Sequence, residues 1–145
     1  MKQASSTQKT YMNSLPKGAD INIFLKEFAI KNNIQTASLN FIGSLEQVSL
    51  GFYDQTTRKY NKKDFFTPFE IVSGTGNISL KDGEVFIHSH VILSDKNYQV
   101  IGGHLFNSKV FAGEYVIYEL PELLLKRNFD KTTGLSLWNN NQISK

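Results

Sequence analysis

The histidines of this chain lie close together in the sequence. His88, His90 and His104 are its only three histidines, in a chain of 145 residues. Neutral imidazole is a common ligand for zinc and similar divalent transition metals. Three histidines without cysteine resemble an open metal site, which keeps a fourth position for water or substrate. The chemistry that these residues could do is therefore binding of a metal or a small anion, and metal-bound water could act as a nucleophile.

The spacing of the first two histidines places them together if they lie on a strand. Residues two apart on a strand share a face, so His88 and His90 point the same way and Ser89 points the opposite way. A competing interpretation is that the histidines are half-buried and hydrogen-bonded along a sheet, without any ligand. An H-x-H pair by itself does not separate the two.

The third histidine joins them only in one class of hairpin. A three-residue loop over 95–97, with its asparagine in the left-handed conformation, pairs His104 with His88 and Gly102 with His90. All three imidazoles then share one face on adjacent strands, about 5 Å apart. A two-residue loop would put His104 on the other face. The metal site is thus also a prediction about this turn.

Other residues near the histidines favour no single mechanism. The two glycines over 102–103 leave room either for a ligand or for close backbone approach. Glu70, Glu114 and Asp95 are candidate acid–base groups or a fourth ligand, but a carboxylate on a strand is also commonly solvated or ion-paired. Ser89 faces away from the site and the chain has no cysteine, so no nucleophile is evident.

The composition fits one soluble domain. The chain is 40% hydrophobic and has no cysteine, which excludes disulfides and thiolate ligands and fits a reducing compartment. Its first residues contain no apolar segment typical of a secretory signal, and no apolar run reaches the roughly 20 residues that cross a bilayer. We expect a cytoplasmic protein without membrane contact.

The charge argues against direct binding of DNA. The net charge is +3, and Arg58 and Arg127 are the only arginines. Arginine is the usual reader of guanine edges and of the minor groove. The basic cluster over 56–64 could touch phosphates, but we interpret it as a solvated loop. Direct DNA binding is therefore not expected without a partner.

The hydrophobic pattern predicts an α+β domain, mainly an antiparallel β-sheet with one substantial N-terminal helix and short additional helices. A single domain is expected over 11–138, between a disordered tail over 1–10 and a polar tail over 139–145. Asp20 is the expected N-cap of the first helix, over 21–32. A short helix is expected over 121–127, after Pro121. Strands are expected over 36–43, 44–53, 65–74, 78–80, 84–93, 98–105, 109–120 and 134–138. Between them we expect a break at Gly43, a loop over 54–64, a break at 74–77 and a turn at Asp82-Gly83. A bulge is expected at Gly113.

Two stretches resemble a known family. "FEIVSGTGNISLKDGEVF" followed by "HSHVILSDKNYQVIGGHL" resembles the PPC domain, for plants and prokaryotes conserved, in the pattern Glu-Ile-Val-Ser, Gly-Asn-Ile, His-x-His and Gly-Gly-His-Leu. The resemblance covers roughly residues 11–138. It implies an α+β domain that forms homotrimers and a metal cluster at His88, His90 and His104. Many members of the family are described as DNA-binding.

The chain departs from the family where arginines would stand. The plant proteins contact DNA through an Arg-Gly-Arg-Pro element, which is absent here. Their Gly-Arg-Phe-Glu-Ile-Leu segment corresponds to 67–72, with Pro68 in place of the arginine. Asn13 or Ser14 stands where bacterial members often have another arginine. Arginine-dependent contacts with anions or partners are therefore not implied.

Three functions remain open from the sequence. The first is a homotrimeric module that binds a metal or small ligand through the three histidines, with zinc as the expected metal. The second is a metal-dependent enzyme that uses the same site, although no activity can be assigned. The third is a DNA-binding or transcription-associated protein.

Overall fold

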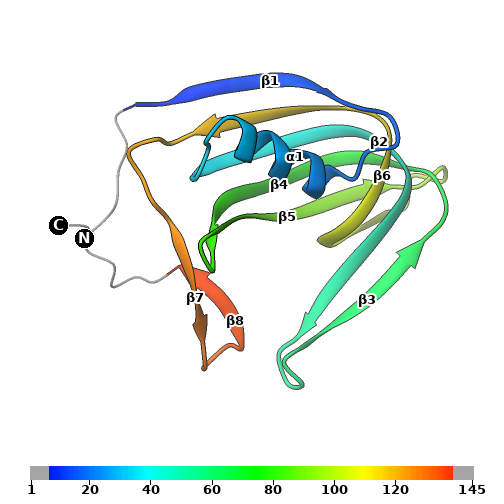
Figure 1. Ribbon diagram of the computed structural model, residues 1–145. Helices are drawn as coiled ribbons and strands as arrows, with labels where there is room; N and C mark the ends of the chain where they lie inside the picture. Colours follow the sequence, from blue (N-terminus) through cyan, green and yellow to red (C-terminus); the bar gives the residue numbers. More distant parts are fainter. Residues whose placement is uncertain (1–6, 139–145) are drawn as a thin grey trace.

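A curved antiparallel sheet with one helix on its inner side forms the protein (Figure 1). The computed structural model describes residues 7–138, so most of the two expected tails, 1–6 and 139–145, lies outside the described residues. The elements are β1 (Lys9–Leu15), α1 (Ile21–Lys31), β2 (Ala37–Asp54), β3 (Lys59–Phe65), β4 (Phe69–Lys81), β5 (Glu84–Ser94), β6 (Val100–Glu119), β7 (Lys126–Asp130) and β8 (Leu135–Trp138).

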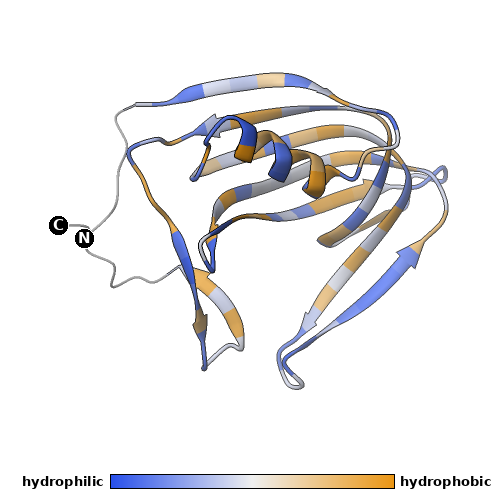
Figure 2. Ribbon diagram, viewed as in Figure 1, coloured by the Kyte–Doolittle hydropathy of each residue, from blue (hydrophilic) through white to orange (hydrophobic). Residues whose placement is uncertain are grey.

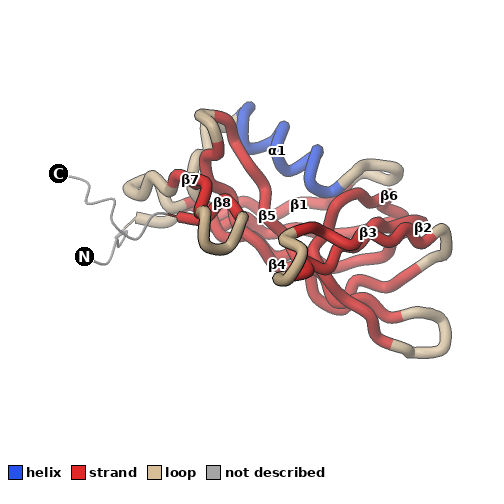
Figure 3. The backbone as a smooth tube through the Cα atoms, turned by 90° about the horizontal axis from the view of Figure 1, so that it is seen from below, coloured by secondary structure: helices blue, strands red, loops and turns tan. Residues whose placement is uncertain are grey.

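The strand pairings close on themselves around the core. The order along the sheet is β3-β2-β6-β5-β4-β7-β8, with β1 on β6, and β2 also pairs with β4. The strands β2, β4, β5 and β6 therefore form a closed circuit. Every pairing is antiparallel except that of β4 with β7. Seen from below, α1 lies along one side of this sheet (Figure 3).

The helix begins where the sequence predicts. The Asp20 side chain accepts a hydrogen bond from the Ile23 amide at 3.0 Å, which caps the helix, and another from the Ser108 amide on β6 at 2.7 Å. One face of the helix, with Leu25 and Ala29, is fully buried against the sheet. With 11 residues the helix is small, so the expectation of a substantial helix is not confirmed.

No second helix occurs within residues 7–138, and the short helix expected over 121–127 is wrong. The chain there makes one turn, in which the Leu123 amide donates to the Leu120 carbonyl. It then joins the sheet, because the Leu80 amide donates to the Leu125 carbonyl and β7 pairs alongside β4. A long-range strand pairing overrides the local preference for helix.

At several positions where the sequence predicted a break between strands, the strand continues. β2 runs through Gly43 as one strand, and Gly43 takes a φ of 139° that favours glycine. β4 runs through 74–77, where Gly74 lets the Phe41 ring pack against the backbone. The bulge expected at Gly113 lies instead at Phe111, since Ser44 pairs with Ala112 and Leu45 with Val110. These glycines serve close packing within continuous strands.

The basic loop expected over 54–64 is mostly a strand. β3 covers Lys59–Phe65 and pairs with the end of β2, which leaves 55–58 as the turn. β3 is hydrophilic along most of its length, unlike the strands of the main sheet (Figure 2). Two further predicted features hold: the β4–β5 hairpin turns at Asp82 and Gly83, both with positive φ, and β8 forms at Leu135–Trp138. The strands expected over 98–105 and 109–120 are one strand, β6, and the strand expected over 65–74 begins at Phe69.

No helix in the part of the chain that the structure describes has the length and apolar character needed to span a membrane.

The double role of Asp20 gives a first prediction. Asp20→Ala should lower the free energy of unfolding by about 1–2 kcal/mol, because it removes the helix cap and leaves the Ser108 amide without an acceptor. Urea denaturation followed by circular dichroism would measure the change. Asp20→Asn keeps one acceptor and should cost less; equal stability of the alanine variant and the parent would contradict this role.

Candidate metal centre

The structure brings the three histidines together through a different register from the predicted one. His90 lies directly opposite His104, and Gly102 lies opposite Ile92. The predicted pairing of His104 with His88 is therefore wrong by two residues. The predicted shared face is kept, because a shift of two residues leaves the alternation of side chains unchanged.

The turn between β5 and β6 explains the shift. It has five residues, 95–99, because the Asp95 carboxylate accepts hydrogen bonds from the amides of Asn97 and Gln99 at 2.8 and 2.9 Å. The Asp95 amide donates to the Gln99 carbonyl at 3.0 Å, and Tyr98 instead of Asn97 takes the left-handed conformation, with a φ of 61°. Three and five are both odd, so the longer turn still leaves His104 beside the other two.

The three imidazoles converge on one point. One nitrogen of each ring lies within 4.8 Å of the other two. The Nε2 atoms of His88 and His90 are 3.2 Å apart. Two Zn–N bonds of about 2.05 Å at a tetrahedral angle put their nitrogens about 3.3 Å apart. This pair already has the spacing of two zinc ligands, and a nitrogen of His104 lies within 4.8 Å of both.

His104 is held tightly by aromatic neighbours. The rings of Tyr60 and Phe106 pack against it, with centroids 5.0 and 4.8 Å away. Gly51 lies opposite His104 on β2, and any side chain there would collide with Phe106. The buried Nδ1 of His104 has no hydrogen-bond partner among the described residues. Buried polar atoms almost always have one, so this ring fits a group that the protein itself does not supply.

Burial keeps the imidazoles neutral. Loss of solvation lowers the pKa of His104 to about 4, and the nearby His90 adds to the effect. Burial also lowers the pKa of His88 to about 4, helped by the positive charge of Arg127. The pKa of His90 is lowered by burial too. Neutral imidazoles at pH 7 are what metal coordination requires.

Arg127, which the sequence did not single out for this site, lies behind His88. Its Nη2 is 3.4 Å from His88 Nδ1 and donates to the Asn77 side chain at 2.8 Å. Metal-binding histidines usually have a carboxylate or carbonyl at this position, so a guanidinium is an unusual neighbour. The only available signal was that Arg127 is one of two arginines in a lysine-rich chain.

The candidate acid–base residues lie away from the histidines. Glu70 pairs with Ser94, four residues or about 13 Å along β5 from His90. Asp95 holds the turn, and Glu114 is ten positions along β6 from His104. Within residues 7–138, the cluster of possible metal ligands consists of the three histidines alone.

The two glycines beside His104 serve close strand approach, which is one of their two expected roles. A Cβ on Gly103 would lie 2.8 Å from the Gly51 carbonyl oxygen, and one on Gly102 would lie 2.7 Å from that of Val91. Both contacts are with backbone, which cannot move aside. Ser89, as predicted, points to the opposite face, where it donates to Asn22 of α1 at 2.7 Å.

Comparison with known proteins identifies the family. The family description of the Plants and Prokaryotes Conserved (PCC) domain matches residues 2–121. The chain belongs to this family, which is the one that the sequence resembles. No curated protein matches the chain.

Solved structures share the whole fold. A metal-containing protein from Archaeoglobus fulgidus is 37% identical, with a TM-score of 0.91 over 97% of this chain and 100% of that one. A plant- and prokaryote-conserved protein from Pyrococcus horikoshii is 33% identical, with a TM-score of 0.89 over 97% and 100%. A protein from Bacteroides thetaiotaomicron, named as a candidate DNA-binding protein, is 28% identical, with a TM-score of 0.84 over 92% and 96%.

Metal-free protein should lose stability as the pH falls from 6.5 towards 4. The unfolded histidines titrate near 6.5 and the folded His88 and His104 near 4, so the unfolded chain binds more protons between these values. The free energy of unfolding therefore rises with pH across this window and is lost on acidification. Urea titrations of His88→Gln/His104→Gln should show a flatter dependence. His90→Gln, at a more exposed position, should flatten it less; an unchanged slope in the double variant would contradict the burial of these groups.

Proposed function

We propose that this protein binds one divalent transition metal, zinc, per subunit through His88, His90 and His104. The observation that carries the proposal is the convergence of three neutral imidazoles on one point, with ligand nitrogens within 4.8 Å of one another. The Archaeoglobus fulgidus relative, named as metal-containing, supports it.

The surroundings of the histidines define what each would contribute. His88 and His104 are half-buried and fixed by their neighbours, whereas His90 is exposed and leaves the cluster open to solvent. A zinc ion with three protein ligands keeps a fourth position, where it acts as a Lewis acid and lowers the pKa of bound water. No carboxylate of residues 7–138 joins the cluster, so an acid–base partner for an enzyme would have to come from the substrate or another subunit.

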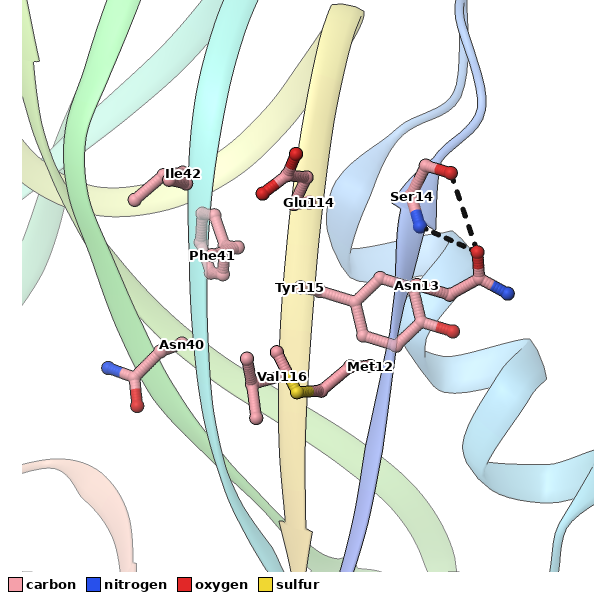
Figure 4. A pocket seen from close by; sticks show the side chains of 9 residues that line it. All are labelled: Met12, Asn13, Ser14, Asn40, Phe41, Ile42, Glu114, Tyr115 and Val116. Carbon is pink, nitrogen blue, oxygen red and sulfur yellow. Dashed lines mark hydrogen bonds between the residues drawn. The ribbon is translucent and has the colours of Figure 1, made fainter.

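We further propose that the protein is a homotrimer, held by the outward face of its sheet. The face away from α1 exposes a band of large apolar side chains, which are Met12, Ile42, Val72, Ile92, Val100 and Phe111. Three neighbouring strands, β1, β6 and β2, place Met12, Val116 and Ile42 around a shallow hollow of about 550 Å³ (Figure 4). Contiguous exposed apolar surface of this kind marks protein contacts. The resemblance to a family whose members form homotrimers supports a second copy of this chain as the partner.

DNA binding is the weaker alternative. The name of the Bacteroides thetaiotaomicron relative favours it. However, Arg127 is buried and engaged by neutral partners, which leaves Arg58 as the only exposed arginine. The exposed lysines of β3 offer phosphate contacts but no reading of bases.

Metal analysis of untagged protein tests the zinc site. We expect close to one zinc per chain by mass spectrometry, and its loss in His88→Ala/His90→Ala with the fold intact. The chain has no other nitrogen or sulfur ligand of these kinds, since it has three histidines and no cysteine. Thr75→Ala, opposite His90 on β4, is the matched control and should retain the metal. Protein that takes up no zinc on titration would refute the proposal.

Light scattering after gel filtration tests the trimer. We expect a mass about three times 16.5 kDa, and a smaller species for Ile42→Lys, since a charge in the apolar band would be buried at the interface. Ile23→Lys, on the outer side of α1, replaces an equally exposed apolar residue and should remain trimeric. A monomeric parent protein would refute the assembly.

A further inference from the structure

A cavity opens beside the histidines, where β5 and β6 separate. The ladder between these strands ends at His90 and His104, and a cavity of about 380 Å³ lies beyond it, with His88 and His104 in its wall. Its size is within the range of small-molecule sites. Aromatic and aliphatic side chains such as Phe86, Phe106 and Leu137 form most of the lining.

The charged side chains that line this cavity are both positive. Lys81 and Arg127 line it, and no aspartate or glutamate of residues 7–138 does. The ammonium group of Lys81 lies 5.3 Å from the centre of the Phe86 ring. A low-dielectric cavity with two cations and no carboxylate favours a negatively charged guest.

Arg127 is buried without an opposite charge. Only 9% of its surface is exposed. Its Nε donates to Ser79 at 2.9 Å and its Nη1 to the Ser136 carbonyl at 3.1 Å, in addition to the Nη2 contact with Asn77. These partners are all neutral, and the described residues offer it no salt bridge. Buried charges are normally paired, because removing them from water is costly.

The Arg127 guanidinium is also held in place by two aromatic rings, and some of its hydrogen-bond donors are free. It lies 5.3 Å from the centres of both the Phe86 and Trp138 rings. Arginine has five N–H donors. Three of these are used by Asn77, Ser79 and Ser136, which leaves the second N–H of Nη1 and the second N–H of Nη2, whose nitrogen lies 3.4 Å from His88 Nδ1.

We propose that this cavity binds a small organic acid, with its carboxylate or phosphate against Arg127 and its apolar body among the aromatic and aliphatic side chains. The inference deepens the proposed function, since the cavity includes two of the three metal-binding histidines. Its physical basis is separate from that of the metal site, because the unpaired buried charge of Arg127 favours an anion whether or not a metal is bound.

Trp138 allows the proposal to be tested directly. It is the only tryptophan of the chain and packs on Arg127, so its fluorescence reports on the cavity. The probes are hexanoate and hexyl phosphate, with hexanamide as the neutral control of the same length. We expect both anions to bind at least about tenfold more tightly than hexanamide, as a hydrogen-bonded ion pair provides.

Variants locate the effect. Arg127→Gln should remove the preference for anions, and Arg127→Lys should keep part of it because it retains the charge. Lys126→Gln is the matched control: it removes one charge at the neighbouring, exposed position of β7 and should bind as the parent does. If Arg127→Gln does not fold, Lys81→Gln, on the other cation of the cavity, should weaken hexanoate binding while hexanamide binding stays the same.

Titrations of metal-free and zinc-loaded samples separate this inference from the metal proposal. Equal binding of hexanoate and hexanamide, or no saturable fluorescence change with any probe at millimolar concentration, would overturn the organic-acid site even in protein that takes up zinc. Protein that prefers the anions but takes up no zinc would keep the organic-acid site and refute the metal centre.

Discussion

The pairing of His90 with His104 is the contact on which both the proposed metal centre and the cavity depend. His104 lies on β6 between His90 of β5 and Gly51 of β2, so one residue belongs to both ladders of the circuit. On one side of this pair, as far as Ser94 and Val100, the strands stay paired. On the other side they separate, and the space between them becomes the cavity beside His88. A single register therefore places both the three histidines and the cavity beside them.

Burying the histidines and Arg127 costs stability, which the packing of the apolar core offsets. Neutral histidines and a buried guanidinium lie on the side of the sheet away from a continuous apolar core, which includes Phe41, Leu39 and Ile117. Such groups are expensive to bury and are found where a ligand needs them. Arg127 lies against His88, where a carboxylate is usual beside a metal-binding histidine, so it adds positive charge to this side of the proposed site.

The sequence predicted that the three histidines share a face. That depends only on whether the turn between the two strands has an odd or an even number of residues. It did not predict the register, which follows from the two amides that the Asp95 carboxylate holds. The family, the capped helix and the Asp82-Gly83 hairpin were also predicted, since their signals are local. Arg127 was missed because its place depends on the parallel pairing of β7 with β4, between segments about 46 residues apart, which no local pattern reveals.

Anomalous diffraction from crystals of the zinc-loaded protein, measured at the zinc edge, tests the account most directly. We predict one peak per chain, about 2.0–2.1 Å from a nitrogen of each of His88, His90 and His104. A peak bonded to only one of these rings, or located elsewhere on the protein, would show that the convergence of the three histidines does not make a metal centre.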